Sequence, residues 1–335
     1  MGNSQYNGKG REWMGLLDSN KIMEIRSHVE KRVVKLPDGT TVPCIGQGTW
    51  YMGDKPQEKA KEIKALQLGI ELGMKVIDTA EMYGNGASER LVGEAIKGRR
   101  DDVFLVSKVY PHNAGLDKIS VACENSLKRL GTDYLDLYLL HWRGRIPLEE
   151  TIEGMENLRK EGKILRWGVS NFDTDDMEEL WNTLNGSNCA TNQVLYHIGS
   201  RGIDFDLLPW HREHHIPIMA YSPLAQGGTL RKQLLTDPTV NEIAKKYNVK
   251  PLQIALAWTI RTNDVIAIPK AGQEQHVLEN AEAAAIELTQ EDLMRHFQNL
   301  VKKCLWISFN MLLKQYSVIR WSCPESQAPI ENKKS

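Results

Sequence analysis

The stretch VIDTAEMYGNG, residues 76–86, begins as a short apolar run and ends in a glycine-containing loop. The amphipathic segment ERLVGEAIKG follows at 89–98, and a second apolar run, VFLVSK, follows at 103–108. A strand, a helix and a strand in this order form a βαβ unit with parallel strands. Because Asp78 ends the first strand and Lys108 ends the second, we expect both side chains at the same edge of the sheet.

The same alternation continues along most of the chain. Short apolar runs separated by helix-length segments occur at 44–50, 75–80, 103–108, 135–141, 166–171, 191–196, 216–222 and 265–270. Eight such repeats predict an α/β fold, a closed (β/α)8 TIM barrel, with functional residues at the carboxyl ends of the strands. A doubly wound sheet is the alternative, and it is disfavoured because no GxGxxG motif follows a strand and opens a helix.

Other segments depart from the repeat. The sequence RVVKLPDGTTVPC at 32–44 predicts an N-terminal β-hairpin, and the long interval 222–265 predicts an extra helical insertion after strand seven. We therefore divide the chain into three parts. These are a polar, loose extension over 1–30, a barrel over 31–290 and a divergent tail over 291–335.

The composition excludes several classes of protein. With 42 basic and 43 acidic side chains, the chain offers no electrostatic reason to bind nucleic acid. Its five cysteines include no CxxC pair, which disfavours a disulfide framework or a metal site. No apolar run is long enough to span a membrane, and the N-terminus lacks the apolar core of a secretion signal. We expect a cytoplasmic protein, monomeric or weakly associating, that acts on a small molecule.

Four polar residues are predicted to meet at the mouth of the barrel. Asp78, Lys108 and His141 end the second, third and fourth strands, and Tyr83 follows in the loop after the second. The position of each residue alone can be explained as a helix cap, a solvated side chain or core packing. Together, the four residues are suited to act as a general acid with a tuned pKa. An ammonium lowers the pKa of a phenol, and a carboxylate keeps that ammonium charged. We expect Lys108 to lower the pKa of Tyr83, Asp78 to keep Lys108 protonated, and a neutral His141 to contact the substrate oxygen.

The ordered motifs resemble those of the aldo-keto reductases. The resemblance covers about residues 38–290 and rests on seven motifs, which are IDTAEMYGNGASERLVGEAI, VFLVSKVYP, LDLYLLHW, GVSNF, TNQVLYH, AYSPLAQGG and IPKAG. The residues within and around these motifs are most similar to those of bacterial members that reduce methylglyoxal and similar small aldehydes. The resemblance implies an NADP-dependent oxidoreductase in which the cofactor supplies a hydride and the protein supplies a proton.

The resemblance also assigns roles by position. Tyr83 corresponds to the proton donor, Lys108 and Asp78 to its charged partners, and His141 to the residue that orients the substrate. The cofactor-binding set implied is Gly48, Thr49, Trp50, Asp78, Ser170, Asn171, Gln193, Tyr221, Ser222, Leu224, Lys270, His276, Glu279 and Asn280. The substrate pocket implied is Trp50, Tyr110, His141 and Trp142.

Two positions depart from the family pattern at the cofactor's 2′-phosphate. His276 stands where an arginine is common, and Ala271 stands where a phosphate-binding serine is common. Lys270 remains, so we expect NADP(H) to be preferred over NAD(H), with a weaker charge contact than an arginine would give.

Two other functions are compatible with part of the pattern. Lys108 at a strand end could form a Schiff base in an aldolase, although Asp78 would keep it protonated. A regulatory or sensor subunit of the same fold, which binds the cofactor with little turnover, is the second alternative.

Overall fold

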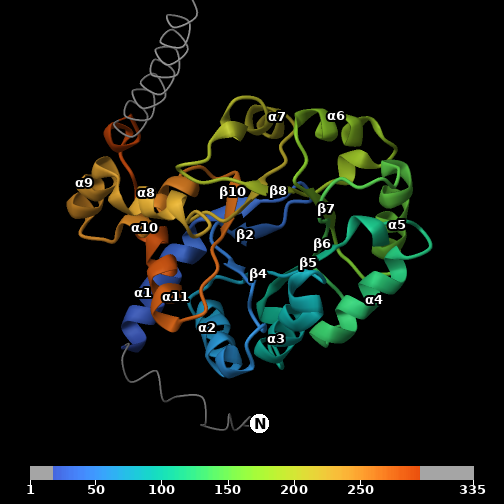
Figure 1. The fold of residues 1–335 in the computed structure, drawn as a ribbon, viewed down its shortest axis with the longest axis horizontal. Helices are drawn as coiled ribbons and strands as arrows, with labels where there is room; N and C mark the ends of the chain where they lie inside the picture. The colour runs from blue at the N-terminus through green and yellow to red at the C-terminus, as the bar shows by residue number, and fades with distance from the viewer. Residues whose placement is uncertain (1–17, 295–335) are drawn as a thin grey trace, which may run out of the picture. The chain divides into compact units, whose positions relative to one another are not determined.

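Eight short parallel strands form the centre of the fold (Figure 1). In the computed structural model, which describes residues 18–294, they are hydrogen-bonded in chain order from β3 to β10. Their bounds are β3 (Gln47–Gly48), β4 (Val76–Asp78), β5 (Phe104–Val109), β6 (Leu137–Leu140), β7 (Trp167–Ser170), β8 (Asn192–Leu195), β9 (Ile218–Tyr221) and β10 (Val265–Ile268). A bridge between Gly48 and Lys270 joins the first strand to the end of the last. The predicted α/β TIM barrel is confirmed.

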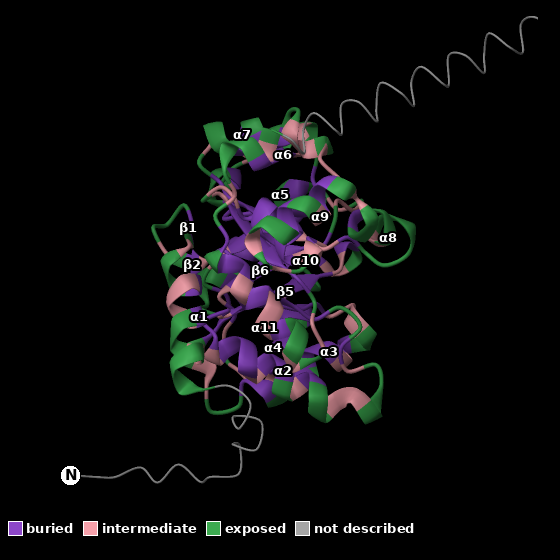
Figure 2. Ribbon diagram, turned by 90° about the vertical axis from the view of Figure 1, so that its left-hand side faces the viewer, coloured by how far each residue is buried: buried purple, intermediate pink, exposed green. Residues whose placement is uncertain are grey.

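Helices surround these strands, as the ring of coiled ribbons in Figure 1 shows. Between and after the strands lie α2 (Lys59–Glu71), α3 (Ala87–Ala95), α4 (Ile119–Leu130), α5 (Leu148–Lys160), α6 (Thr174–Asn182), α7 (Leu207–Glu213), α10 (Pro251–Thr259) and α11 (Glu274–Glu282). Figure 2 shows the result of this covering: the strands are buried and the outer faces of the helices are exposed. All six residues of β5 are buried, so Lys108 lies on a strand that is removed from water.

The predicted N-terminal hairpin is present. Strands β1 (Val33–Lys35) and β2 (Thr41–Pro43) pair antiparallel, and Gly39 adopts a φ of +90° in the turn that joins them. Asp38 in this turn accepts a hydrogen bond of 2.6 Å from Arg166, which directly precedes β7. The hairpin therefore covers the amino ends of the strands, opposite to the ends that carry Asp78, Lys108 and His141.

The expected loose extension over residues 1–30 is wrong for its described part. Helix α1 (Ser19–Lys31) is capped by Asp18 and packs against α11. Ile25 and Val29, four residues apart, lie on one face of the helix and are buried. The rest of that extension, residues 1–17, lies outside the described residues.

The helical insertion after the seventh barrel strand is confirmed. Helices α8 (Thr229–Thr236), α9 (Pro238–Tyr247) and α10 all lie between β9 and β10. The barrel unit extends to Leu288, and the predicted tail falls, from residue 295 on, outside the described residues. None of the helices within 18–294 combines the length and apolar character needed to cross a membrane.

Candidate active site

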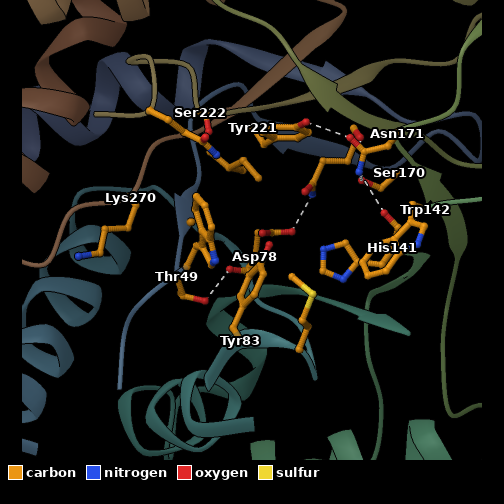
Figure 3. Close-up of a pocket in the computed structure, with 16 residues that line it drawn as sticks. Thr49, Asp78, Tyr83, His141, Trp142, Ser170, Asn171, Tyr221, Ser222 and Lys270 are labelled. Atoms are coloured by element: carbon orange, nitrogen blue, oxygen red, sulfur yellow. Dashed lines mark hydrogen bonds between the residues drawn. The ribbon is translucent and has the colours of Figure 1, made fainter. Parts of the chain in front are cut away.

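A cavity of about 280 Å³ opens at the carboxyl ends of the barrel strands (Figure 3). Strand ends and the loops that follow them supply its walls. The lining residues are Gly48, Thr49, Trp50, Asp78, Met82, Tyr83, His141, Trp142, Ser170, Asn171, Gln193, Tyr221, Ser222, Gln226, Ile268 and Lys270. The structure thus brings most of the predicted site residues to one place.

Lys108 lies behind this cavity and is fully buried. Its ammonium contacts Asp78 at 2.7 Å, and it donates to the carbonyl of Thr79 at 2.9 Å and to the hydroxyl of Tyr83 at 3.1 Å. An ammonium has three N–H donors, and three acceptors surround it here. Burial lowers the pKa of Lys108, but the charges and hydrogen bonds of Asp78 and Tyr83 together outweigh burial and leave that pKa above its usual value. Lys108 is therefore charged at neutral pH, as expected.

Tyr83 begins the 3₁₀ turn η2 (Tyr83–Gly86), which follows β4 and reverses the chain toward the cavity. Gly84 and Asn85 both adopt positive φ in this turn, so the reversal is tight. Burial raises the pKa of the Tyr83 phenol above its usual value, and the Lys108 ammonium only partly opposes that effect. The expected net lowering of the pKa is wrong, because removal from water outweighs the ammonium. The phenol is protonated at neutral pH and can act as an acid.

His141 faces Tyr83 across the cavity, with ring centroids 5.7 Å apart and nearly perpendicular planes. Burial and the nearby Lys108 ammonium lower the pKa of His141 to about 3. Its Nδ1 has no hydrogen-bond partner within the described chain. The imidazole is neutral, as predicted, and can donate one hydrogen bond without adding a charge.

A hydrogen-bonded group of side chains forms the wall opposite Tyr83. Ser170 donates to the Gln193 carbonyl at 2.8 Å, and Tyr221 donates to the Asn171 side-chain oxygen at 2.9 Å. The amide nitrogen of Gln193 donates to Asp78 at 2.7 Å. The hydroxyl of Tyr221 thus fixes its ring beside this wall, whose amide and hydroxyl groups could hold a flat carboxamide. Figure 3 shows these residues around one space.

The first strand brings backbone rather than side chain to the cavity. A Cβ on Gly48 would lie 2.7 Å from the carbonyl oxygen of Ile268, so only glycine fits against β10. The hydroxyl of the next residue, Thr49, donates to the backbone carbonyl of Asp78 at 2.8 Å. Ser88 in turn donates to the Thr49 hydroxyl at 2.7 Å. This chain of hydrogen bonds fixes the end of β4 and so the position of Asp78, its last residue.

The sequence of the chain matches the model of the Aldo/keto reductase family over residues 44–298. The chain belongs to the aldo/keto reductase family.

Curated relatives agree with this assignment. The chain is 54% identical to methylglyoxal reductase YeaE of Escherichia coli (strain K12) over 265 residues, 79% of this chain and 93% of that protein. It is 36% identical to a glyoxal reductase of Bacillus subtilis (strain 168) over 266 residues, 78% of this chain and 91% of that protein. The family predicted from seven ordered motifs is confirmed.

Solved structures of other aldo/keto reductases share the fold. One from Klebsiella pneumoniae, in complex with NADP and acetate, has a TM-score of 0.78 and 54% identity. The alignment covers 80% of this chain and 94% of that one. A second structure of an aldo-keto reductase from the same organism is a complex with NADPH, with the same TM-score, identity and coverage.

Not every residue predicted from the family resemblance lines the cavity. Trp50 and Trp142 do, whereas Tyr110 packs edge-on against Trp142 with ring centroids 5.9 Å apart. Leu224 lines an adjoining cavity together with Ser222 and Lys270. His276, Glu279 and Asn280 lie on α11 and line neither cavity.

Several lining residues were missed by sequence reasoning. Met82 and Ile268 add apolar surface to the main cavity, Gln226 lines both cavities, and Arg231 lines the adjoining one. Met82, Gln226 and Ile268 lie within the quoted motifs but were not singled out there, and Arg231 lies outside those motifs. Residues 18–294 contain no group of three or more His, Cys, Asp or Glu side chains placed to hold a metal ion.

Proposed function

We propose that this protein is an NADPH-dependent reductase of small aldehydes and ketones of the methylglyoxal type, with Tyr83 as general acid. The observation that carries this proposal is the contact of 3.1 Å between the Tyr83 hydroxyl and the buried Lys108 ammonium at the edge of the cavity. A protonated phenol held by a cation is suited to protonate an oxygen as negative charge develops on it.

Bound NADPH would supply the hydride that reaches the carbonyl carbon. As this oxygen gains charge, Tyr83 gives it the phenolic proton, and the Lys108 ammonium stabilises the tyrosinate that remains. Asp78 holds Lys108 in place and keeps it charged. His141 is neutral and lies beside Tyr83, so it can donate a hydrogen bond to the carbonyl oxygen and orient the substrate. Water then returns a proton to Tyr83.

The size and walls of the cavity support a small substrate. A volume of about 280 Å³ must hold both the nicotinamide ring and the substrate. Trp50, Trp142, Met82 and Ile268 supply apolar surface, which excludes water from the reacting atoms. Two relatives described above are named for methylglyoxal and glyoxal reduction, and both compounds are small dicarbonyls.

The residues at the cavity fit a phosphorylated nicotinamide dinucleotide. The Ser170–Asn171–Gln193 wall offers hydrogen bonds to a carboxamide, although both donors of Asn171 bond to protein acceptors and one must be exchanged. The Lys270 ammonium lies at the other end of the cavity from His141, as Figure 3 shows. Two similar structures contain NADP or NADPH, which supports a preference for NADP(H) over NAD(H).

The test is the exchange of Tyr83 for phenylalanine. We expect Tyr83→Phe to lower kcat for methylglyoxal reduction by about 10²- to 10⁴-fold, since the variant has no proton to give, while the Kd for NADPH stays unchanged. Absorbance of NADPH gives the rate and tryptophan fluorescence gives the Kd. Tyr134→Phe is the matched control, because Tyr134 precedes β6 at the far end of the barrel. A Tyr83→Phe enzyme with full activity would disprove the proposed role.

The same assay separates the two alternatives. An aldolase needs a neutral lysine, whereas Lys108 is charged and donates to three acceptors, which argues against a Schiff base. A sensor would bind NADPH tightly and reduce no carbonyl compound. Normal NADPH binding with no turnover on any aldehyde would therefore favour the sensor.

A further inference from the structure

A second cavity of about 350 Å³ adjoins the first. Trp50, Ser222, Gln226 and Lys270 line both, so the two form one continuous site. The additional walls of the second cavity come from the segment after β9 and from α8. A ligand too long for the first cavity can therefore extend along Lys270 toward α8.

Two cations line this second cavity without an acidic partner. Arg231 lies in the first turn of α8 and is half-buried, and Lys270 follows β10. Across residues 18–294, neither side chain forms an ion pair with an aspartate or a glutamate. Most arginines in this part of the chain do have such partners. An anion bound between Arg231 and Lys270 would balance both charges.

Position 276, where the family resemblance places a phosphate-binding arginine, has an acidic side chain within ion-pair distance; among residues 18–294, Arg231 and Lys270 have none. His276 on α11 is exposed and lies 3.4 Å from Glu279, which also accepts a hydrogen bond of 2.5 Å from Lys250. The charges at this end of α11 are thus already paired within the protein. Because Glu279 already contacts Lys250 and His276, these two side chains are less available to an external anion than Arg231 or Lys270.

We infer that Arg231 is, with Lys270, a phosphate-binding residue for the dinucleotide, and this inference rests on the proposed function. A guanidinium presents two parallel N–H donors to a phosphate and binds it more strongly than a neutral group does. Arg231 comes from the helix inserted after β9 and compensates for the missing arginine at position 276. The phosphate is either the pyrophosphate or the 2′-phosphate, both of which the same guanidinium chemistry recognises.

The test compares Arg231→Gln with Lys232→Gln. Lys232 is the neighbouring cation on the same helix, is exposed, and does not line either cavity. We expect Arg231→Gln to raise the Kd for NADPH about ten-fold, equal to about 1.4 kcal/mol, and to reduce the salt dependence of that Kd. Lys232→Gln should leave it within about two-fold. Tryptophan fluorescence measures the Kd, and the thermal midpoint confirms that both variants fold.

Titration with NADH identifies which phosphate is bound. A higher Kd for NADPH alone assigns Arg231 to the 2′-phosphate, and an equal rise for both dinucleotides assigns it to the pyrophosphate; either supports the inference. An Arg231→Gln protein that binds both as tightly as the wild type overturns the inference and leaves the proposed function intact. A wild-type protein that binds neither dinucleotide overturns both.

Discussion

At the residue scale, the proposed chemistry depends on the buried ion pair of Lys108 and Asp78. Both side chains are almost fully removed from water, at 0% and 3% exposure. Each charge is tolerated there because the other compensates it, and further hydrogen bonds from Gln193 and to Thr79 and Tyr83 satisfy the remaining atoms. In the mechanism proposed above, the same pair also stabilises the phenolate form of Tyr83 once the proton has left.

Removal of both members of this pair should cost less stability than the sum of the two single removals. Asp78→Asn leaves the buried ammonium without a counter-charge, so we expect the free energy of unfolding to fall by about 3–5 kcal/mol. The double variant Asp78→Asn with Lys108→Met should lose less than the sum of the two single variants. Denaturant unfolding of the four proteins measures this difference. Additive losses would show that the two charges do not compensate each other.

At the scale of elements, the contact between β3 and β10 closes the barrel. Gly48 bridges to Lys270, and its missing side chain allows the carbonyl of Ile268 to approach. The same contact brings Thr49, Trp50 and Lys270 to the wall of the cavity. Closure of the barrel and part of the cavity wall thus depend on one pair of strands.

Gly48→Ala tests this closure. Its Cβ would meet backbone at 2.7 Å, so the strands must separate, and we expect a loss of about 1–3 kcal/mol in the free energy of unfolding. Gly202→Ala is the matched control, because a Cβ there has no heavy atom within 4 Å and should change stability by less than about 0.5 kcal/mol. Chemical denaturation of both variants gives the comparison. Equal stabilities would mean that β3 and β10 can move apart without cost.

For the whole molecule, buried neutral histidines link stability to pH. Burial lowers the pKa of His141 to about 3 and that of His211 to about 4, from an ordinary value of 6.5. His211 lies between the Ile216 carbonyl and the Asn192 amide, a setting that suits the neutral ring. At a pH between these lowered pKa values and the ordinary value, the unfolded chain binds more protons at the two histidines than the folded chain does. The contribution of these histidines to the free energy of unfolding is therefore highest above about pH 6.5 and falls as the pH decreases toward 4.

His211→Gln should make this pH dependence shallower. The variant cannot take up a proton at this position on unfolding, so its free energy of unfolding should decline less between pH 6.5 and 4 than that of the wild type. The exposed His215, replaced by asparagine, is the control. Unfolding by urea at several pH values measures the slopes. A slope for His211→Gln equal to that of the wild type would assign the acid sensitivity to other groups.

Periodicity and strand-end chemistry were sufficient to predict much of this protein. All eight strands, the hairpin, the insertion and the meeting of Asp78, Tyr83, Lys108 and His141 follow from local patterns, because a parallel barrel aligns the carboxyl ends of its strands. The segment 19–31 was expected to be only weakly helical within a loose extension, because its apolar face is narrow, with two buried residues, and its packing against α11 is a long-range contact.

The tertiary structure alone decided the electrostatic balance and the long-range contacts. The net rise in the pKa of Tyr83 depends on how much water burial removes, which no local pattern reports. Arg231 and Lys232 are adjacent cations in sequence, and only the packing of α8 determines which one lines the cavity. The fold and the meeting of the four strand-end side chains follow from short-range periodicity, which a sequence displays directly. The pKa shifts of these side chains and the walls of the second cavity depend on segments brought together only by folding.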